Sequence, residues 1–288
     1  METRALHPRF GVEVMGLDLK ATPLEAAYPP LRALFEEHSL LLLRGQHLSD
    51  ARQLALGRLF GPLEDREPGR AAAEICPLTN ETPEGLLPAD DLRLVDLLAN
   101  GLWHTDSTFL PVPALANLLQ ARVVPAQGGE TEFASSRAGW AALDPALKER
   151  LRGRRLKHRL QHSRAKVDPR LLSLEKVSRW EGQSWPAVLA NPVNGRESLY
   201  IASHAYEVEG LEPAEGAALI EAATAAVTGP GCIYSHRWRP GDLIVWDERA
   251  VLHRGRPWPP EEPRTLVSIC VSLQDADGLA AMRSGSAG

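Results

Sequence analysis

Apolar side chains near the amino terminus follow first the period of a strand and then that of a helix. Residues 10–19 alternate apolar and polar positions, and residues 24–37 carry leucines at helical spacing. Residues 39–44 are almost wholly apolar, which predicts a short buried strand. A second helix is expected to begin after Ser49, a typical N-cap residue, and to end at a Gly-Pro pair. This part of the chain is therefore predicted to be a mixed layer of helices and strands.

From Trp103 onward, short strand patterns separated by Gly and Pro turns dominate the chain. Many short strands of this kind are typical of a sandwich or a barrel. Helical spacing interrupts them at residues 137–151 and 213–227. The expected strands cover residues 116–123, 131–134, 199–201, 232–236, 243–246 and 265–271.

Three segments lack a clear period. Residues 65–91 are rich in Pro, Gly, Glu and Ala, and because irregular loops of that length are usually functional, we predict a lid over the site. Residues 161–186 are expected to form a second insert, and the chain from about residue 276 is expected to be disordered. One domain over residues 1–288 is predicted to carry these segments.

Composition narrows the classes of function. The 288 residues are 44% hydrophobic and 24% charged, as is usual for a globular protein, and a net charge of −5 does not suggest a nucleic-acid surface. Three cysteines without C-x-x-C spacing fit a reducing compartment and argue against a disulfide framework. The sequence contains no signal-peptide core and no membrane-length apolar run. We expect a cytoplasmic protein with a small-molecule substrate and no nucleic-acid or membrane partner; a homo-oligomer stays open.

Candidate chemistry begins with three potential metal ligands, His104, Asp106 and His253. On a strand, residues i and i+2 point to one face, so His104 and Asp106 can bind one ion while His253 arrives from another strand. Two imidazoles and one carboxylate are the ligands of non-haem Fe(II) sites that keep coordination positions open. A short His/Asp pair is weak evidence alone, because an exposed strand edge shows the same pattern. The same ligands also suit zinc, so a zinc-dependent hydrolase is an alternative.

Further blocks accompany these ligands in a fixed order. They are residues 100–109, residues 124–133, residues 241–255, and Arg264. With these blocks, the chain resembles the taurine dioxygenase / 2,4-dichlorophenoxyacetate dioxygenase family of Fe(II)- and 2-oxoglutarate-dependent oxygenases. The resemblance implies a mainly β fold with flanking helices, the distorted jelly roll called the double-stranded β-helix.

The resemblance also assigns roles at the positions that match. It implies that His104, Asp106 and His253 ligate Fe(II), and it assigns no catalytic residue beyond these ligands. The cosubstrate 2-oxoglutarate would chelate the metal, and Arg264 would bind its distal carboxylate through a bidentate guanidinium. Thr131 would add a hydroxyl hydrogen bond at the same end. A surface arginine and a strand threonine bonded to backbone are the alternatives.

Substrate-binding candidates are less sharply defined. Asn100, Ser107 and Phe109 fall where family members place residues beside substrate and cosubstrate, although Phe109 also fits core packing and Asn100 also fits a loop cap. Ser268 stands where family members that act on sulfonates or carboxylates commonly carry a second arginine. A serine hydroxyl does not replace a full charge, so taurine is disfavoured as substrate. The other cations considered for the substrate anion are Arg66, Arg70 and Lys166.

The predicted function is an Fe(II)- and 2-oxoglutarate-dependent dioxygenase that uses O2. It would hydroxylate a small, aryloxyalkanoate-like organic acid and cleave it oxidatively to a phenol. A sulfonate or alkyl sulfate dioxygenase is the alternative within this reaction class. A zinc-dependent hydrolase would leave Arg264 and Thr131 without a purpose, and a non-catalytic binding protein would not need an intact ligand set. A halogenase would lack the carboxylate ligand, so Asp106 argues against it.

Overall fold

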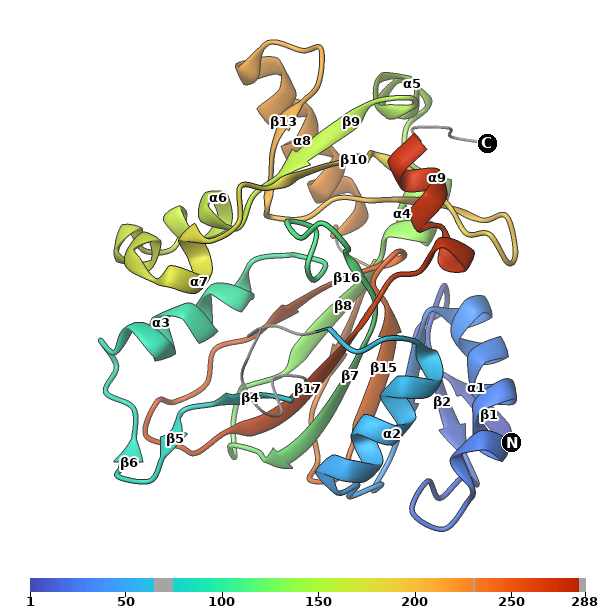
Figure 1. Cartoon of the computed structure of the whole chain (residues 1–288), viewed down its shortest axis with the longest axis vertical. Coiled ribbons are helices and arrows are strands. Elements are labelled where there is room, and N and C mark those ends of the chain that lie inside the picture. Colours follow the sequence, from blue (N-terminus) through green and yellow to red (C-terminus); the bar gives the residue numbers. More distant parts are fainter. Residues whose placement is uncertain (65–74, 230, 285–288) are drawn as a thin grey trace.

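The computed structural model describes residues 1–64, 75–229 and 231–284. Its centre consists of β-sheets flanked by helices (Figure 1). The larger sheet has the order β1-β2-β3-β15-β7-β17-β4, and its neighbours are antiparallel except for β2 and β3. Its strands are β1 (Glu2–Ala5), β2 (Val12–Met15), β3 (Leu40–Leu43), β15 (Leu243–Asp247), β7 (Ala114–Val123), β17 (Thr265–Ser272) and β4 (Cys76–Thr79).

A smaller antiparallel sheet packs against the larger one. Its strands, in spatial order, are β14 (Ile233–His236), β8 (Thr131–Ser135) and β16 (Val251–Gly255). Side chains from both sheets, among them Leu42, Phe133 and Trp246, form one buried apolar cluster. Two packed sheets with flanking helices confirm the predicted fold class, a distorted jelly roll.

Strand β3 shows how the larger sheet is buried on both faces. Leu40 and Leu42 belong to the cluster between the sheets, whereas Leu41 and Leu43 pack into a second cluster under the amino-terminal helices. Successive side chains of a strand point to opposite faces, so four consecutive leucines supply two buried faces.

Helices α1 (Leu24–His38) and α2 (Asp50–Phe60) pack on one face of the larger sheet, α1 against β3 and β15 and α2 against β7 and β17 (Figure 1). Both match the predicted segments. The Ser49 hydroxyl accepts a hydrogen bond from the Arg52 amide at 3.3 Å, as expected of an N-cap. Helix α8 (Pro213–Val227) coincides with the helix predicted over residues 213–227. In the described ranges, no helix combines the length and the apolar character that a bilayer crossing requires.

The prediction of one helix over residues 137–151 is wrong. The segment forms two helices, α4 (Ser136–Ala142) and α5 (Pro145–Leu151). The Asp144 carboxylate accepts hydrogen bonds from two amides in the first turn of α5, and proline occupies the start of that helix. An Asp-Pro pair therefore ends one helical run and begins another.

Two predicted strands differ in position. The strand expected over residues 10–19 is confined to β2, because Gly11 and Gly16 on either side adopt φ values of 75° and 73°. The strand expected at residues 199–201 is β12 (Glu197–Leu199). In both cases the apolar pattern extends beyond the residues that form sheet hydrogen bonds.

Short elements occupy residues 161–186, which were predicted to be an insert without a clear period. They lie at the same end of the molecule as α3 and η1 (Figure 1). The elements of the insert are α6 (Leu160–Ala165), η2 (Pro169–Ser173) and α7 (Glu175–Ser178), whereas α3 (Leu92–Leu98) and η1 (Ala99–Gly101) come before the metal-ligand segment. Two small sheets follow, formed by β9 (Arg155–His158), β10 (Gln183–Pro186) and β13 (Ala205–Val208), and by β11 (Val188–Ala190) with β12.

The predicted disorder from about residue 276 is wrong for the residues that the structure describes. A 3-10 turn, η3 (Asp275–Asp277), leads into α9 (Leu279–Ser284). Leu279 is buried and joins the cluster between the larger sheet and α1. Residues 285–288 lie outside the described residues.

The predicted lid falls partly outside the described residues, since residues 65–74 are not described. The remainder is not an irregular loop. Strand β4 pairs with β17 at the edge of the larger sheet, and β5 (Glu81–Thr82) and β6 (Gly85–Leu86) form a hairpin. The prediction of an irregular loop is therefore wrong for residues 76–86. Movement of the predicted lid over the site stays a prediction.

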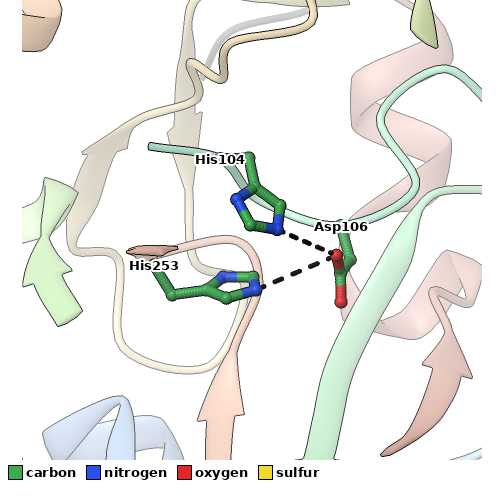
Figure 2. A group of neighbouring side chains, drawn as sticks. All are labelled: His104, Asp106 and His253. Carbon is green, nitrogen blue, oxygen red and sulfur yellow. Dashed lines mark ion pairs between the residues drawn. The ribbon is translucent and has the colours of Figure 1, made fainter. Parts of the chain in front are cut away.

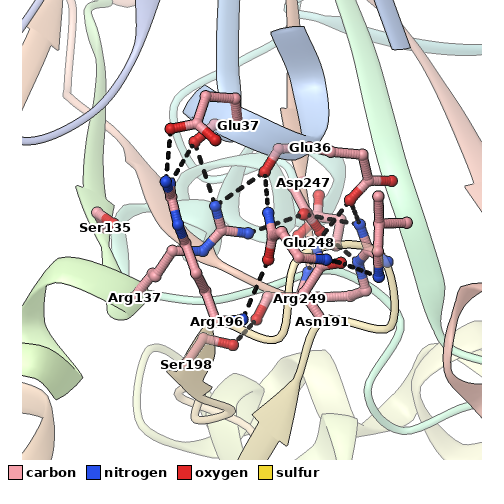
Figure 3. A network of polar contacts seen from close by, with 12 residues as sticks. Glu36, Glu37, Ser135, Arg137, Asn191, Arg196, Ser198, Asp247, Glu248 and Arg249 are labelled. Atoms are coloured by element: carbon pink, nitrogen blue, oxygen red, sulfur yellow. Dashed lines mark hydrogen bonds and ion pairs between the residues drawn. The ribbon is translucent and has the colours of Figure 1, made fainter. Parts of the chain in front are cut away.

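A buried ionic network joins α1 to the turn between β15 and β16 (Figure 3). The Arg249 guanidinium donates to Asp247 at 2.9 Å and to Glu36 at 2.8 Å, and it also donates to the Asp277 carbonyl at 3.1 Å. Asn191 donates to the same Glu36 oxygen at 2.6 Å. Burial opposes the charge, but the two carboxylates raise the pKa of Arg249, so the guanidinium stays charged.

We predict that Arg249→Met lowers the free energy of unfolding by about 3 kcal/mol or more, because it removes the cation between two buried carboxylates. Urea unfolding of the metal-free protein measures this loss. Arg150→Met is the matched control, because Arg150 forms an exposed ion pair with Glu215. That change should alter stability by less than about 0.5 kcal/mol. Equal effects of the two substitutions would contradict a stabilising role for the network.

Candidate metal centre and cavity

Three side chains from two distant segments converge in the interior (Figure 2). The Asp106 Oδ1 atom lies 3.6 Å from His104 Nε2 and 3.9 Å from His253 Nε2. One ligand atom from each of the three residues lies within 4.8 Å of the others. The structure therefore brings together the three residues that the sequence indicated.

The local backbone differs from the expected strand. His104 forms an isolated antiparallel bridge with His253, through backbone hydrogen bonds of 3.0 and 2.8 Å. Asp106 already lies in a turn, and Ser107 after it has a φ of 60°. The prediction that one strand carries both early ligands is wrong, because the chain turns immediately after the bridge. The turn, rather than the strand period, aims the carboxylate toward the imidazoles.

In His104 and Asp106, the polar atom that does not face the other ligands is hydrogen-bonded to the surrounding protein. His104 Nδ1 lies 2.7 Å from the Leu102 carbonyl, which leaves Nε2 to face Asp106. Asn117 donates to Asp106 Oδ2 at 2.7 Å, which leaves Oδ1 to face the imidazoles. Burial lowers the pKa of His104, although Asp106 opposes the shift, so the imidazole is neutral at neutral pH. A neutral imidazole and a carboxylate held from behind suit metal ligation, so the set of His104, Asp106 and His253 fits a divalent ion.

A fully buried carboxyl group, Glu248, lies under the ligand turn. It accepts hydrogen bonds from the Thr105 hydroxyl at 2.6 Å and from the Asp106 amide at 2.9 Å. Its Oε2 atom lies 4.0 Å from His253 Nδ1. Burial and the neighbouring Asp106 charge raise the pKa of Glu248 well above its usual range. The residue thus connects the turn that carries Asp106 to the strand that carries His253.

A cavity of about 430 Å³ opens beside the ligands. Its lining includes all three ligands, Thr131, Arg264 and the four substrate-binding candidates. Apolar walls come from the helical end of the molecule and from β17. They include Leu110, Leu160, Trp180 and Leu266.

Thr131 and Arg264 are both buried and line this cavity. The Arg264 guanidinium donates to the Gly129 carbonyl at 3.1 and 3.3 Å and lies 4.8 Å from the ring centroid of Trp258. The Thr131 hydroxyl accepts a hydrogen bond from Trp238 Nε1 at 2.9 Å. Burial lowers the pKa of Arg264 to about 10, so it remains protonated at neutral pH. The cavity lining thus includes a buried cation and a buried hydroxyl group.

The four substrate-binding candidates all line the cavity, each with a different partner. Asn100 accepts a hydrogen bond from Arg164 at 3.3 Å. Ser107 donates to Glu64 at 2.6 Å, and the Phe109 ring packs edge-on against His204 with centroids 5.1 Å apart. The Ser268 hydroxyl donates to Asn117 Oδ1 at 3.0 Å. Ser268 therefore supports the residue that holds Asp106.

Sequence reasoning missed two cavity residues, Arg164 and Lys176, which come from the short helices of the predicted insert. Nothing in their spacing relates them to the ligand motif. Of the cations proposed for a substrate anion, Lys166 is exposed and outside the cavity lining, and Arg66 and Arg70 lie outside the described residues. The sequence indicated that a basic residue of this segment could bind the substrate anion, and it pointed to Lys166. The residue that lines the cavity is Arg164, two positions earlier.

Comparison with known proteins gives concordant matches. A family model described as "Taurine catabolism dioxygenase TauD, TfdA family" matches residues 2–270. The alpha-ketoglutarate-dependent 2,4-dichlorophenoxyacetate dioxygenase of Cupriavidus pinatubonensis is 38% identical over 259 residues, which are 87% of this chain and 90% of the relative. The (S)-phenoxypropionate/alpha-ketoglutarate-dioxygenase of Sphingobium herbicidovorans is 35% identical over 273 residues, 91% of each chain. The crystal structure of AAD-2 in complex with Mn(II) and N-oxalylglycine matches with a TM-score of 0.85 and 32% identity, over 94% of this chain and 98% of that one.

We predict that His104→Ala weakens binding of Fe(II) or Mn(II) on the order of 100-fold or more, because loss of outer contacts alone costs 10–100-fold at metal sites. Anaerobic titration calorimetry with either ion measures the change, and circular dichroism checks folding. His162→Ala is the control, since His162 is outside the cavity lining. Unchanged metal affinity in the His104 variant would remove it from the ligand set.

Proposed function

Because the chain belongs to the taurine catabolism dioxygenase TauD, TfdA family, we propose that it hydroxylates an aryloxyalkanoate and releases a phenol. It is an alpha-ketoglutarate-dependent dioxygenase, an oxidoreductase that uses Fe(II), 2-oxoglutarate and O2. The observation that carries the proposal is the convergence of His104, Asp106 and His253 beside a cavity with apolar walls. We place the reaction in the cytoplasm.

His104, Asp106 and His253 would hold Fe(II) and leave coordination positions open toward the cavity. When bound, Fe(II) supplies oxidation of a substrate C–H bond by O2, coupled to conversion of 2-oxoglutarate to succinate and CO2. The protein's contribution is to fix the ligands from behind. The Leu102 carbonyl orients His104, and Asn117 orients Asp106, so the donor atoms need little rearrangement.

Arg264 and Thr131 would bind the distal carboxylate of 2-oxoglutarate. Among the described residues, the Arg264 guanidinium forms no salt bridge, although only 5% of the residue is exposed. A buried cation that donates only to a carbonyl is incompletely compensated, so an incoming carboxylate is strongly favoured. The Thr131 hydroxyl already accepts from Trp238, which leaves its own hydrogen to donate.

The remaining cavity would take the substrate. Phe109, Leu160 and Trp180 offer apolar surface for an aromatic ring. Hydroxylation of the carbon between the ether oxygen and the carboxylate gives a hemiacetal. That hemiacetal loses a phenol and leaves a 2-oxo acid, so one oxygen atom enters the substrate and the other enters succinate.

The other reaction classes fit less well. Ser268 is buried and bonded to Asn117, so its position offers no cation for a sulfonate or an alkyl sulfate. A zinc-dependent hydrolase is set aside, because the matching family and the relatives are dioxygenases. We retain residues 65–91 as a predicted lid; in its described part, Cys76 and Leu78 belong to the cavity wall.

Arg264→Ala should raise the 2-oxoglutarate concentration needed for half-maximal succinate formation by about 30-fold or more, because a buried charge-assisted bond contributes on the order of 2–5 kcal/mol. Arg264→Lys should recover part of the loss, since it keeps the charge without the bidentate fork. Arg237→Ala, which removes an exposed arginine, is the control. The same 2-oxoglutarate dependence in all variants would assign the cosubstrate to another cation.

The substrate proposal is tested by offering phenoxyacetate, phenoxypropionate and taurine to the Fe(II)-loaded enzyme with 2-oxoglutarate. We expect phenol release from an aryloxyalkanoate to exceed sulfite release from taurine by at least about tenfold in kcat/KM, because the apolar walls of the cavity suit an aromatic ring, which taurine lacks. Colorimetric phenol and sulfite assays measure the two products. Faster turnover of taurine would overturn the proposed substrate class.

A further inference from the structure

Two cations and one carboxylate form a cluster where the short helices meet the cavity. Arg164 Nε lies 2.7 Å from one Asp96 oxygen, and Lys176 Nζ lies 2.5 Å from the other. Arg164 also donates to Asn100 Oδ1 at 3.3 Å. These three residues and Asn100 all line the cavity, and each comes from a different short helix. Asp96 lies on α3, Asn100 on η1, Arg164 on α6 and Lys176 on α7. The cluster is therefore assembled by the fold.

Counting the residues that the structure describes, the cluster carries a net positive charge, because Asp96 balances only one of its two cations. Arg164 and Asp96 have side-chain exposures of only 12% and 10%, whereas Lys176 is 63% exposed. A charge in a site with little water interacts more strongly with an incoming anion than an exposed charge does. The arginine is thus the part of the cluster that would bind an anion tightly.

The Arg164 guanidinium is also oriented for this task. Its bonds to the described residues use Nε toward Asp96 and Nη2 toward Asn100. A guanidinium has five N–H donors in one plane, so these bonds fix the plane and leave donors for a further carboxylate. Asp96 therefore positions the arginine without using all of its donors.

The other cavity cations are less suitable for the substrate. Arg264 donates to the carbonyl of Gly129, two residues before Thr131, and the proposed function assigns it to 2-oxoglutarate. Arg256 also lines the cavity, but its side chain is 46% exposed and lies 3.7 Å from Glu132, which also binds Arg254. Ser268, the position of the usual second arginine, is neutral. Of the cavity cations in the described ranges that remain for a second acid, Arg164 is the least exposed.

We propose that Arg164, held by Asp96 and Asn100, binds the carboxylate of the substrate and makes the enzyme specific for organic acids. This inference rests on the proposed function, since it concerns the acid that the dioxygenase hydroxylates. The carboxylate of the acid then lies at the helical end of the cavity beside Arg164, and the apolar surface of Leu160 and Trp180 is left for the aromatic ring. A cation from α6 thereby takes the place of the arginine that is absent at position 268.

The test compares phenoxyacetate with phenoxyacetamide, which has the same shape without the charge. Dissociation constants are measured anaerobically by calorimetry on the complex with Fe(II) and 2-oxoglutarate, and kcat/KM is measured from phenol release. Arg164→Met should weaken phenoxyacetate binding at least about 30-fold, which corresponds to roughly 2 kcal/mol. Phenoxyacetamide binding should change less than about threefold, and the KM for 2-oxoglutarate should stay unchanged.

Three further variants separate position from charge. Lys166→Met removes a charge two residues away, outside the cavity lining, and should leave phenoxyacetate affinity within about twofold. Arg256→Met should cost far less than Arg164→Met, because its charge is more exposed. Arg164→Lys should recover part of the affinity for the acid, which a variant with a collapsed helical end would not do.

The outcomes distinguish this inference from the proposed function. If the wild type binds phenoxyacetate and the Arg164 variant does not, but no phenol forms, the anchor stands and the proposed reaction fails. If acid and amide bind the wild type equally, the anchor is overturned whatever the chemistry. An equal loss for acid and amide in Arg164→Met, or the main loss in Arg256→Met, would also overturn it.

Discussion

The metal centre depends on two backbone hydrogen bonds between segments that are far apart in the sequence. The bridge between His104 and His253 places their ring centroids 4.1 Å apart, with both Nε2 atoms facing Asp106. A slip of one residue would turn one imidazole to the opposite face. Every interaction that fixes the register of β16 therefore also fixes the geometry of the ligands.

Strand β16 is held at both of its ends and along its length. Immediately before it, Arg249 binds the carboxylates of the buried network. Along it, His253 pairs with Phe133, and at its end Gly255 pairs with Thr131. One short strand thus connects the ionic core, a metal ligand and the proposed cosubstrate end of the cavity. A shift at either end of β16 would move His253 relative to the other two metal ligands.

The parts of the site that were predictable from sequence are those whose chemistry requires given residue types at given positions. His104, Asp106 and His253 form such a pattern, and Arg264 follows at a spacing that the family resemblance interprets. Their convergence could not be read from strand period, because the turn after His104 directs Asp106. Arg164 could not be identified, since α6 has only six residues and shows no period that would define its faces.

The fold class was predicted correctly, and the individual elements that were missed have similar physical reasons. Apolar runs identified the central strands, including β3 and β15, because a strand buried on both faces needs a continuous run. Strand β4 was missed because Pro77 interrupts its pattern, and proline is tolerated there only because β4 is an edge strand. The break before α5 had a visible signal in Asp144-Pro145, which the apolar spacing across it obscured.

The strand order of the larger sheet also has a consequence for how the protein is made. Strand β7, which carries Asn117, has as its two neighbours β15 and β17, and both follow it far along the chain. During synthesis, β7 therefore emerges with two open edges, and its partners β15 and β17 follow only after α8 has been made. Such long-range pairing is slow and exposes an aggregation-prone strand in the meantime. The edges of β7 therefore stay open to pairing with other chains until β15 and β17 have been made, and the metal ligands come together only at that stage.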